Sequence, residues 1–132
     1  MNRLTIGEVA DRTEVSVSTI RYYEKRGLIP EPDRFESSGY RAFAPETVRR
    51  IRFIRHAQSL GFTREEIKKL LSLRARCDTS CREVREVAED KIAEIDDKIA
   101  KLENMRQGLA SLAEVCPGDL TTECPILEVL EP

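Results

Sequence analysis

Hydrophobic residues in the second half of the chain recur at steps of three and four between residues 84 and 113. This spacing is typical of a helix that pairs with another helix along one apolar face. We call this face the apolar seam, and Arg106 is its one charged position. Its members are Val84, Ala88, Ile92, Ile95, Ile99, Leu102, Arg106, Leu109 and Ala113. The pattern predicts a long dimerisation helix over residues 77–115 that forms an antiparallel coiled coil with a second copy.

Two short, closely connected helices are predicted near the start of the chain. Thr5 and Glu8 form a capping box that opens a helix ending near Thr13. Ser16 can cap a second helix over residues 17–26, and the connection between the two is tight. Two such helices are typical of a helix-turn-helix, the motif whose second helix enters the major groove of DNA.

A turn-rich stretch follows the helix-turn-helix. Pro30 and Pro32 disfavour helix there, and a Ser-Ser-Gly turn over residues 37–39 precedes Tyr40 and Arg41. The stretch therefore predicts a small hairpin wing.

Three further helices are predicted beyond the wing. The third covers residues 45–61, and a second capping box at Thr63 opens the fourth. A third box, Ser80 with Glu83, places Cys81 at the first position of the long helix. Pro125 begins a last short helix close to the end of the chain. The chain is thus predicted to be mainly α-helical.

Charge divides the chain into two halves. Residues 1–76 hold 16 Lys and Arg against 10 Asp and Glu, a net charge of +6, whereas residues 77–132 carry a net charge of −8. The basic half favours a polyanionic partner such as DNA. For the arginines of the third helix, we favour a solvated face over a DNA contact; they are Arg49, Arg50, Arg52 and Arg55.

The expected compartment is the cytoplasm. The chain has four cysteines but lacks an apolar amino-terminal segment, which argues against secretion and a disulfide framework. It also lacks an apolar run long enough to span a bilayer.

Four stretches resemble the MerR family of transcription regulators: TIGEVADRTEVSVSTIRYYEKRGLIPEPDR, SSGYRAF, FIRHAQSLGFTREEIKKLL and CPGDLTTECPIL. The resemblance covers nearly the whole chain, in order. It implies a winged helix-turn-helix head with a second helix pair (residues 1–76), a dimerisation helix (77–115), and a metal-binding loop with a short helix (116–132). It also implies a homodimer that binds a palindromic promoter and activates transcription by distorting the DNA for RNA polymerase.

The same resemblance implies a set of DNA-binding residues on the second helix and the wing. Arg21 matches the position that reaches into the major groove, with Ser18 beside it, while Tyr23 and Arg41 match phosphate contacts. Because adjacent residues do not share a helix face, one of Tyr22 and Tyr23 is as well explained by core packing. The full predicted set is Ser16, Ser18, Thr19, Arg21, Tyr22, Tyr23, Arg34, Tyr40 and Arg41.

Three cysteines are the predicted metal ligands: Cys81, Cys116 and Cys124. Thiolates bind soft ions, and a continuous helix would hold Cys81 and Cys116 roughly 50 Å apart, so their sulfurs cannot meet within one chain. Antiparallel pairing would lay Cys81 of one subunit beside Cys116 and Cys124 of the other. Cys77 matches no family role, and we expect it to be incidental.

The identity of the metal depends on the number of ligands. The family's copper-group sensors use two loop cysteines for a monovalent ion, Cu(I) or Au(I), and have a serine where this chain has Cys81. A third sulfur favours a divalent thiophilic ion. The resemblance to the family's mercury sensor implies a trigonal site and puts Hg(II) ahead of Pb(II), Cd(II) or Zn(II). Zinc usually has four ligands. The single histidine, His56, is expected to be a surface or packing residue and not a ligand. Asp119 or Glu123 could add an oxygen ligand. The seven residues between Cys116 and Cys124 are closer to the copper-sensor loop and leave the monovalent alternative open.

Two other functions are compatible with the cysteines. The DNA-binding protein could respond to thiol oxidation instead of metal. A thiol enzyme or a metal-storage module is the third alternative, but no nucleophile and base are evident together, so we predict that the chain is not an enzyme.

Overall fold

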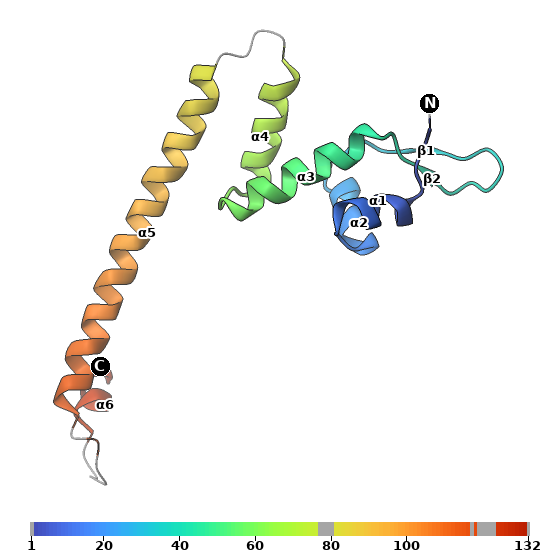
Figure 1. Ribbon diagram of the computed structural model, residues 1–132. Coiled ribbons are helices and arrows are strands. Elements are labelled where there is room, and N and C mark those ends of the chain that lie inside the picture. Colours follow the sequence, from blue (N-terminus) through green and yellow to red (C-terminus); the bar gives the residue numbers. More distant parts are fainter. Residues whose placement is uncertain (1, 77–80, 117, 119–123, 132) are drawn as a thin grey trace. The chain divides into compact units, whose positions relative to one another are not determined.

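The computed structural model describes residues 2–76, 81–116, 118 and 124–131. Its elements are α1 (Ile6–Thr13), α2 (Val17–Lys25), β1 (Asp33–Arg34), β2 (Arg41–Ala42), α3 (Glu46–Ser59), α4 (Arg64–Ala75), α5 (Cys81–Val115) and α6 (Pro125–Leu130) (Figure 1). The predicted mainly α-helical fold with a two-stranded wing is confirmed.

Contacts divide the chain into two compact units, Met1–Arg85 and Glu86–Pro132, which we call the head and the stalk. The division falls inside α5. The sequence instead divided the chain after residues 76 and 115, according to the expected functions of the three segments. These boundaries stay predictions.

Capping boxes begin two of the head's helices. The hydroxyl of Thr5 accepts the backbone N–H of Glu8 at 3.1 Å, and the Glu8 carboxylate accepts the N–H of Thr5 at 3.0 Å. Thr63 and Glu66 repeat this arrangement at the start of α4. Both predicted boxes are therefore confirmed, whereas the third rests on Ser80, which lies outside the described residues.

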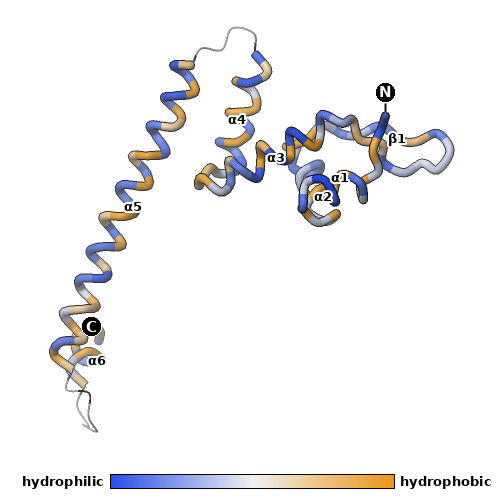
Figure 2. Tube along the Cα trace, in the orientation of Figure 1, coloured by the Kyte–Doolittle hydropathy of each residue, from blue (hydrophilic) through white to orange (hydrophobic). Residues whose placement is uncertain are grey.

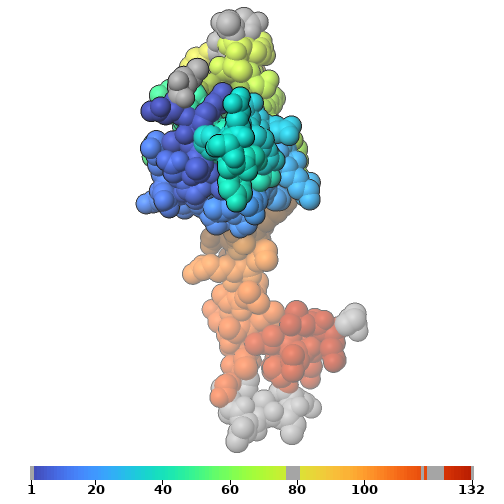
Figure 3. Space-filling model, turned by 90° about the vertical axis from the view of Figure 1, so that its right-hand side faces the viewer, coloured from blue at the N-terminus to red at the C-terminus, as the bar shows by residue number. Residues whose placement is uncertain are grey.

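The wing is a short antiparallel hairpin tied to the start of the chain. Asp33 pairs with Ala42 and Arg34 with Arg41, and Gly39 takes a φ of 74° in the connecting turn. Leu4 and Phe43 exchange two backbone hydrogen bonds, each 2.8 Å long. The wing thus joins the rest of the head at its base, and Figure 3 shows it exposed on one face of the head.

The head has its own hydrophobic core, to which helices α1 to α4 and the base of the wing all contribute. Fully burying one large aliphatic or aromatic side chain stabilises a fold by roughly 1.5–3 kcal/mol. The largest fully buried side chains are Phe43, Ile20, Leu28, Ile29, Ile51, Ile54, Ile67 and Val9. A core of this kind fixes α2 and the wing against each other.

Helix α5 is continuous over 35 residues, and its apolar seam is open to solvent in the single chain. Figure 2 shows hydrophobic residues alternating with hydrophilic ones along the whole of α5. Six seam residues are 38 to 63 % exposed: Val84, Ile92, Ile95, Ile99, Leu102 and Leu109. Among the described residues, no helix is long and apolar enough to cross a membrane.

Candidate functional site

The outer side of α2 carries polar and basic side chains that are open to solvent. Ser18, Arg21, Tyr22 and Lys25 are exposed. Ser16 is the N-cap of α2, where its hydroxyl accepts the backbone N–H of Thr19 at 3.1 Å and bonds to the Thr19 hydroxyl at 2.8 Å. The cap orders the start of the helix, so that the exposed positions beyond it have a fixed direction.

The two adjacent tyrosines of α2 lie in different environments. Tyr22 is 44 % exposed, whereas Tyr23 is 4 % exposed and belongs to the core. The hydroxyl of Tyr23 donates to Oε1 of Gln58 on α3 at 3.2 Å, and burial raises the pKa of Tyr23. The core-packing alternative therefore applies to Tyr23 and not to Tyr22. A phosphate could reach Tyr23 only through a hydroxyl that is already engaged.

One of the predicted wing residues is tied to α2. Nε of Arg41 donates to the Glu24 carboxylate at 2.8 Å, and both side chains are largely shielded from solvent. The other two, Arg34 and Tyr40, are exposed, Tyr40 by 74 %. The predicted phosphate contact of Arg41 would thus share its guanidinium with Glu24, and the same ion pair holds the wing beside α2.

The arginines of α3 do more than form a solvated face. Arg52 and Arg55 are exposed, as expected, but they also donate to the carbonyls of Arg12 at 2.8 Å and Thr13 at 3.2 Å. These carbonyls lie at the carboxyl end of α1, where no intrahelical partner exists and the helix dipole favours a cation. In the same way Arg50 donates to the carbonyl of Leu28 at 2.7 Å, just after α2. Arg50, Arg52 and Arg55 therefore bind the backbone at the ends of both helices of the helix-turn-helix.

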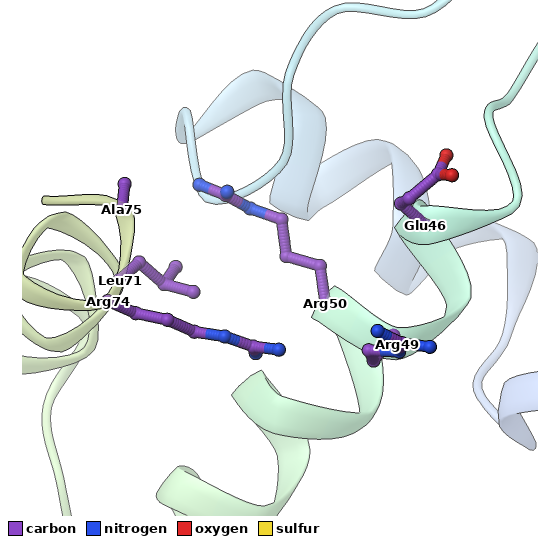
Figure 4. A pocket seen from close by; sticks show the side chains of 6 residues that line it. All are labelled: Glu46, Arg49, Arg50, Leu71, Arg74 and Ala75. Carbon is purple, nitrogen blue, oxygen red and sulfur yellow. The ribbon is translucent and has the colours of Figure 1, made fainter. Parts of the chain in front are cut away.

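The groove between α3 and α4 is lined with cations (Figure 4). Three arginines line it, with a single carboxylate at Glu46, and the residues are Glu46, Arg49, Arg50, Leu71, Arg74 and Ala75. Burial, followed by the nearby positive charge of Arg74, lowers the pKa of Arg50. Guanidinium groups carry no metal-binding lone pair at neutral pH, so this groove does not suit a cationic effector.

The predicted metal ligands lie at the two ends of α5. Cys81 is the first residue of α5 and is exposed, whereas the half-buried Cys116 directly follows its last residue. Cys124 is also half-buried, at the N-cap of α6. At about 1.5 Å per residue, the helix spans roughly 50 Å. All three thiols are free, and the single chain does not bring Cys81 to the other two.

Other possible ligands add nothing to this set in the described part of the chain. There, no three His, Cys, Asp or Glu side chains gather as a metal site would require. His56 is exposed on α3, as a surface residue would be. Cys77, Asp119 and Glu123 lie outside the described residues.

Figure 3 shows α6 against the last turns of α5. A mostly apolar groove lies between the two helices. It is lined by Met105, Gly108, Leu109, Ser111, Leu112 and Val129. Leu109 belongs to the apolar seam, so the groove continues the exposed face of α5. The contact positions Cys124, at the start of α6, within the same unit as Cys116.

Sequence reasoning missed the polar contacts that join the helices. Three such contacts are Tyr23–Gln58, Arg41–Glu24 and Tyr22–Arg64, with sequence separations of 35, 17 and 42 residues, respectively. Helical periodicity relates residues three and four positions apart, so it carries no signal for such pairs.

Two family models match the chain. The model described as MerR HTH family regulatory protein matches residues 4–74, and the model described as MerR, DNA binding matches residues 48–112. Together they cover the helix-turn-helix, the wing, α3, α4 and most of α5.

Similar proteins and structures extend the likeness over nearly the whole chain. The mercuric resistance operon regulatory protein of Bacillus cereus is 45% identical over 129 residues, covering 97% of each chain. The structure of PbrR691 from Ralstonia metallidurans CH34 with lead(II) has a TM-score of 0.87 at 34% identity and covers 96% of this chain and 98% of that one. The structure of MerR from Bacillus megaterium MB1 with mercury(II) has a TM-score of 0.76 at 41% identity and covers 98% and 100%.

Proposed function

The chain belongs to the MerR family of helix-turn-helix regulatory proteins, and we propose that it is a metal-responsive transcription activator that acts as a homodimer on a palindromic promoter. It is a DNA-binding regulator and not an enzyme. In this proposal it works in the cytoplasm, and a divalent thiophilic ion, Hg(II) ahead of Pb(II), Cd(II) and Zn(II), is its effector. The effector changes the shape of the promoter that RNA polymerase uses.

The head supports the DNA-binding part of the proposal. Arg21 and Lys25 are exposed on α2, and Arg34 and Tyr40 are exposed on the wing. Cations and hydroxyls of this kind bind phosphates and base edges. The Arg41–Glu24 ion pair links the wing to α2. The two elements can therefore contact DNA together in one fixed arrangement.

The observation that carries the proposal is the placement of the cysteines at opposite ends of α5. One unbroken helix separates Cys81 from Cys116 by roughly 50 Å and exposes an apolar seam between them. Burial of that seam against a second, antiparallel copy would bring the opposite ends of two helices together. Each of two metal sites would then combine Cys81 of one subunit with Cys116 and Cys124 of the other.

The donor set fits a soft divalent ion. Cys81, Cys116 and Cys124 are free thiols in the structure, and three thiolates suit the trigonal coordination of a large thiophilic ion. The mercury and lead proteins among the similar chains support the same class of effector. Because each site spans two subunits, occupation favours one arrangement of the dimer, and the heads move relative to each other on DNA.

A metal titration of the wild type and Cys81→Ser tests this assignment. We expect the wild type to take up two Hg(II) per dimer, with absorption in the thiolate charge-transfer region, and Cys81→Ser to bind divalent ions at least tenfold more weakly. Cys77→Ser is the matched control, because it removes an equal sulfur four residues earlier and should titrate like the wild type. Full divalent binding and transcription response in Cys81→Ser would refute the three-sulfur site.

A monovalent effector is the second candidate, and the spacing of the loop favours it. Seven residues separate Cys116 from Cys124, and two thiolates suffice for linear Cu(I) or Au(I). In that case Cys81→Ser would leave the response to Cu(I) intact, and wild-type protein would respond to Cu(I) at a lower free concentration than to Hg(II). The same titration therefore separates the two candidates.

A further inference from the structure

Tyr22 of α2 is held by an arginine from another helix. Nη1 of Arg64, the first residue of α4, donates to the hydroxyl oxygen of Tyr22 at 2.7 Å across 42 positions of sequence. The guanidinium carbon of Arg26 lies 5.4 Å from the centroid of the Tyr22 ring. Two cations thus fix one exposed phenol, one at its oxygen and one near its ring.

This contact sets the direction in which the phenol can donate. The bond from Arg64 takes up a lone pair of the Tyr22 oxygen, so the hydroxyl proton is directed elsewhere, and Tyr22 is 44 % exposed. A hydroxyl that accepts a charge-assisted hydrogen bond becomes a stronger donor in turn. An acceptor oxygen that carries negative charge is the partner such a group prefers.

The positive charge around the phenol is only weakly compensated. Arg64 lies 3.4 Å from the carboxylate of Glu65, whose side chain is 75% exposed. Exposed ion pairs of this kind contribute little and are screened by salt. Among the residues that the structure describes, Arg26 has no ion pair. The cluster therefore presents two guanidinium groups and one O–H donor, a combination suited to a phosphate.

We propose that Tyr22, Arg26 and Arg64 form a binding site for a phosphate of the DNA backbone, which extends the DNA contact from α2 to the start of α4. The inference rests on the proposed DNA-binding function and adds two residues, Arg26 and Arg64, to the predicted set. Arg64 serves both to orient Tyr22 and to neutralise the phosphate. A backbone phosphate has no sequence identity, so the site contributes affinity and register rather than base specificity.

The test measures the dissociation constant of the dimer for its promoter fragment and for an unrelated duplex at several salt concentrations. For Arg64→Ala we expect five- to tenfold weaker binding to both duplexes. The slope of log K against log salt should fall by about 0.9 for each lost phosphate contact, counted once per subunit. Tyr22→Phe should also weaken DNA binding. The double variant should lose less binding free energy than the sum of the losses in the two single variants, because the two groups act together.

Lys69→Ala is the matched control, since it removes one exposed positive charge from the same helix. Arg64→Lys should keep the salt slope and restore only part of the affinity, because a lysine is charged but lacks the planar fork. If Arg64→Ala matches Lys69→Ala in affinity and slope, or if Tyr22→Phe and Arg64→Ala are fully additive, the phosphate site is wrong. Failure of the wild type to bind either duplex would instead contradict the proposed function.

Discussion

The head and α5 use the same residue type in opposite ways. Ile51 and Ile54 in the head are completely buried, whereas Ile92 and Ile99 on α5 are 56 and 57 % exposed. The head therefore completes its own core, and α5 exposes apolar surface that a second copy must cover. Six exposed seam residues forfeit on the order of 10 kcal/mol of burial, part of which association would return. The difference teaches that the head folds around a core from one chain, whereas the apolar seam of α5, with the metal sites proposed at its ends, depends on a second copy.

Charge on the seam should produce the largest effect and act only on dimerisation. We expect Ile95→Asp with Ile99→Asp to raise the dimer dissociation constant about a thousandfold, roughly 4 kcal/mol, because each dimer would bury four unpaired charges. Sedimentation equilibrium measures this constant. Ala100→Asp is the control, since it adds one carboxylate per chain to α5 at a position outside the seam. Equal dimerisation of the two proteins would contradict the assignment of the seam.

Truncation in the head should act on folding instead. Ile54→Ala removes buried methyl and methylene groups from the core, and we expect it to lower the free energy of unfolding by about 3 kcal/mol. Ile54→Val, which removes a single methylene group, should lower it by about 1 kcal/mol. Urea denaturation followed by circular dichroism measures both. A loss below 1 kcal/mol for Ile54→Ala would show that the head does not depend on its own core.

The arginines that bind the end of α1 should contribute less than the core. Arg55→Ala leaves the carbonyl of Thr13 without its guanidinium donor, and we expect a loss of about 1 kcal/mol in the free energy of unfolding. Arg49→Ala removes an equal charge from α3, and no hydrogen bond of Arg49 is present among the described residues. Urea denaturation should therefore separate the two variants. Equal stability would mean that the contact to α1 adds nothing.

The smallest effect concerns the capping box of α1. The hydrogen bonds from Thr5 hold the pKa of Glu8 below its ordinary value of 4.5, so the carboxylate is favoured in the folded state. Its contribution to stability is present above pH 4.5 and is lost as the pH falls through the lowered folded pKa. We expect Glu8→Ala to be less stable than the wild type at pH 6, with the two converging in acid. A difference that grows on acidification would contradict this.

Local signals in the sequence predicted the elements well. The capping pairs at Thr5 and Thr63, the N-cap at Ser16 and the seam of α5 each depend on residues a few positions apart, and each is found where it was predicted. Prolines and turn residues between 30 and 39 likewise predicted the wing. Such features follow from backbone geometry, which is the same in any chain.

Contacts between elements could not be predicted in the same way. The tyrosine pair on α2 resolved into one core residue and one exposed residue only because Gln58 and the core lie on the side of Tyr23. Likewise, nothing in the spacing of Arg52 indicated that it would donate to the carbonyl of Arg12, 40 positions earlier. The predicted metal site is harder still to derive from the sequence, because its ligands would come from two chains. The distances between these ligands depend on how the two chains pair, which the sequence of one chain does not determine.

Subunit complementation tests the shared metal site most directly. Heterodimers of a Cys81→Ser chain and a Cys116→Ser/Cys124→Ser chain can be isolated by co-expression with two affinity tags. In a shared arrangement, Cys81 of the second chain meets Cys116 and Cys124 of the first, so the heterodimer should bind one Hg(II) with wild-type affinity. Neither homodimer has a complete three-sulfur site. A heterodimer that binds Hg(II) no more tightly than the better of the two homodimers would contradict the account.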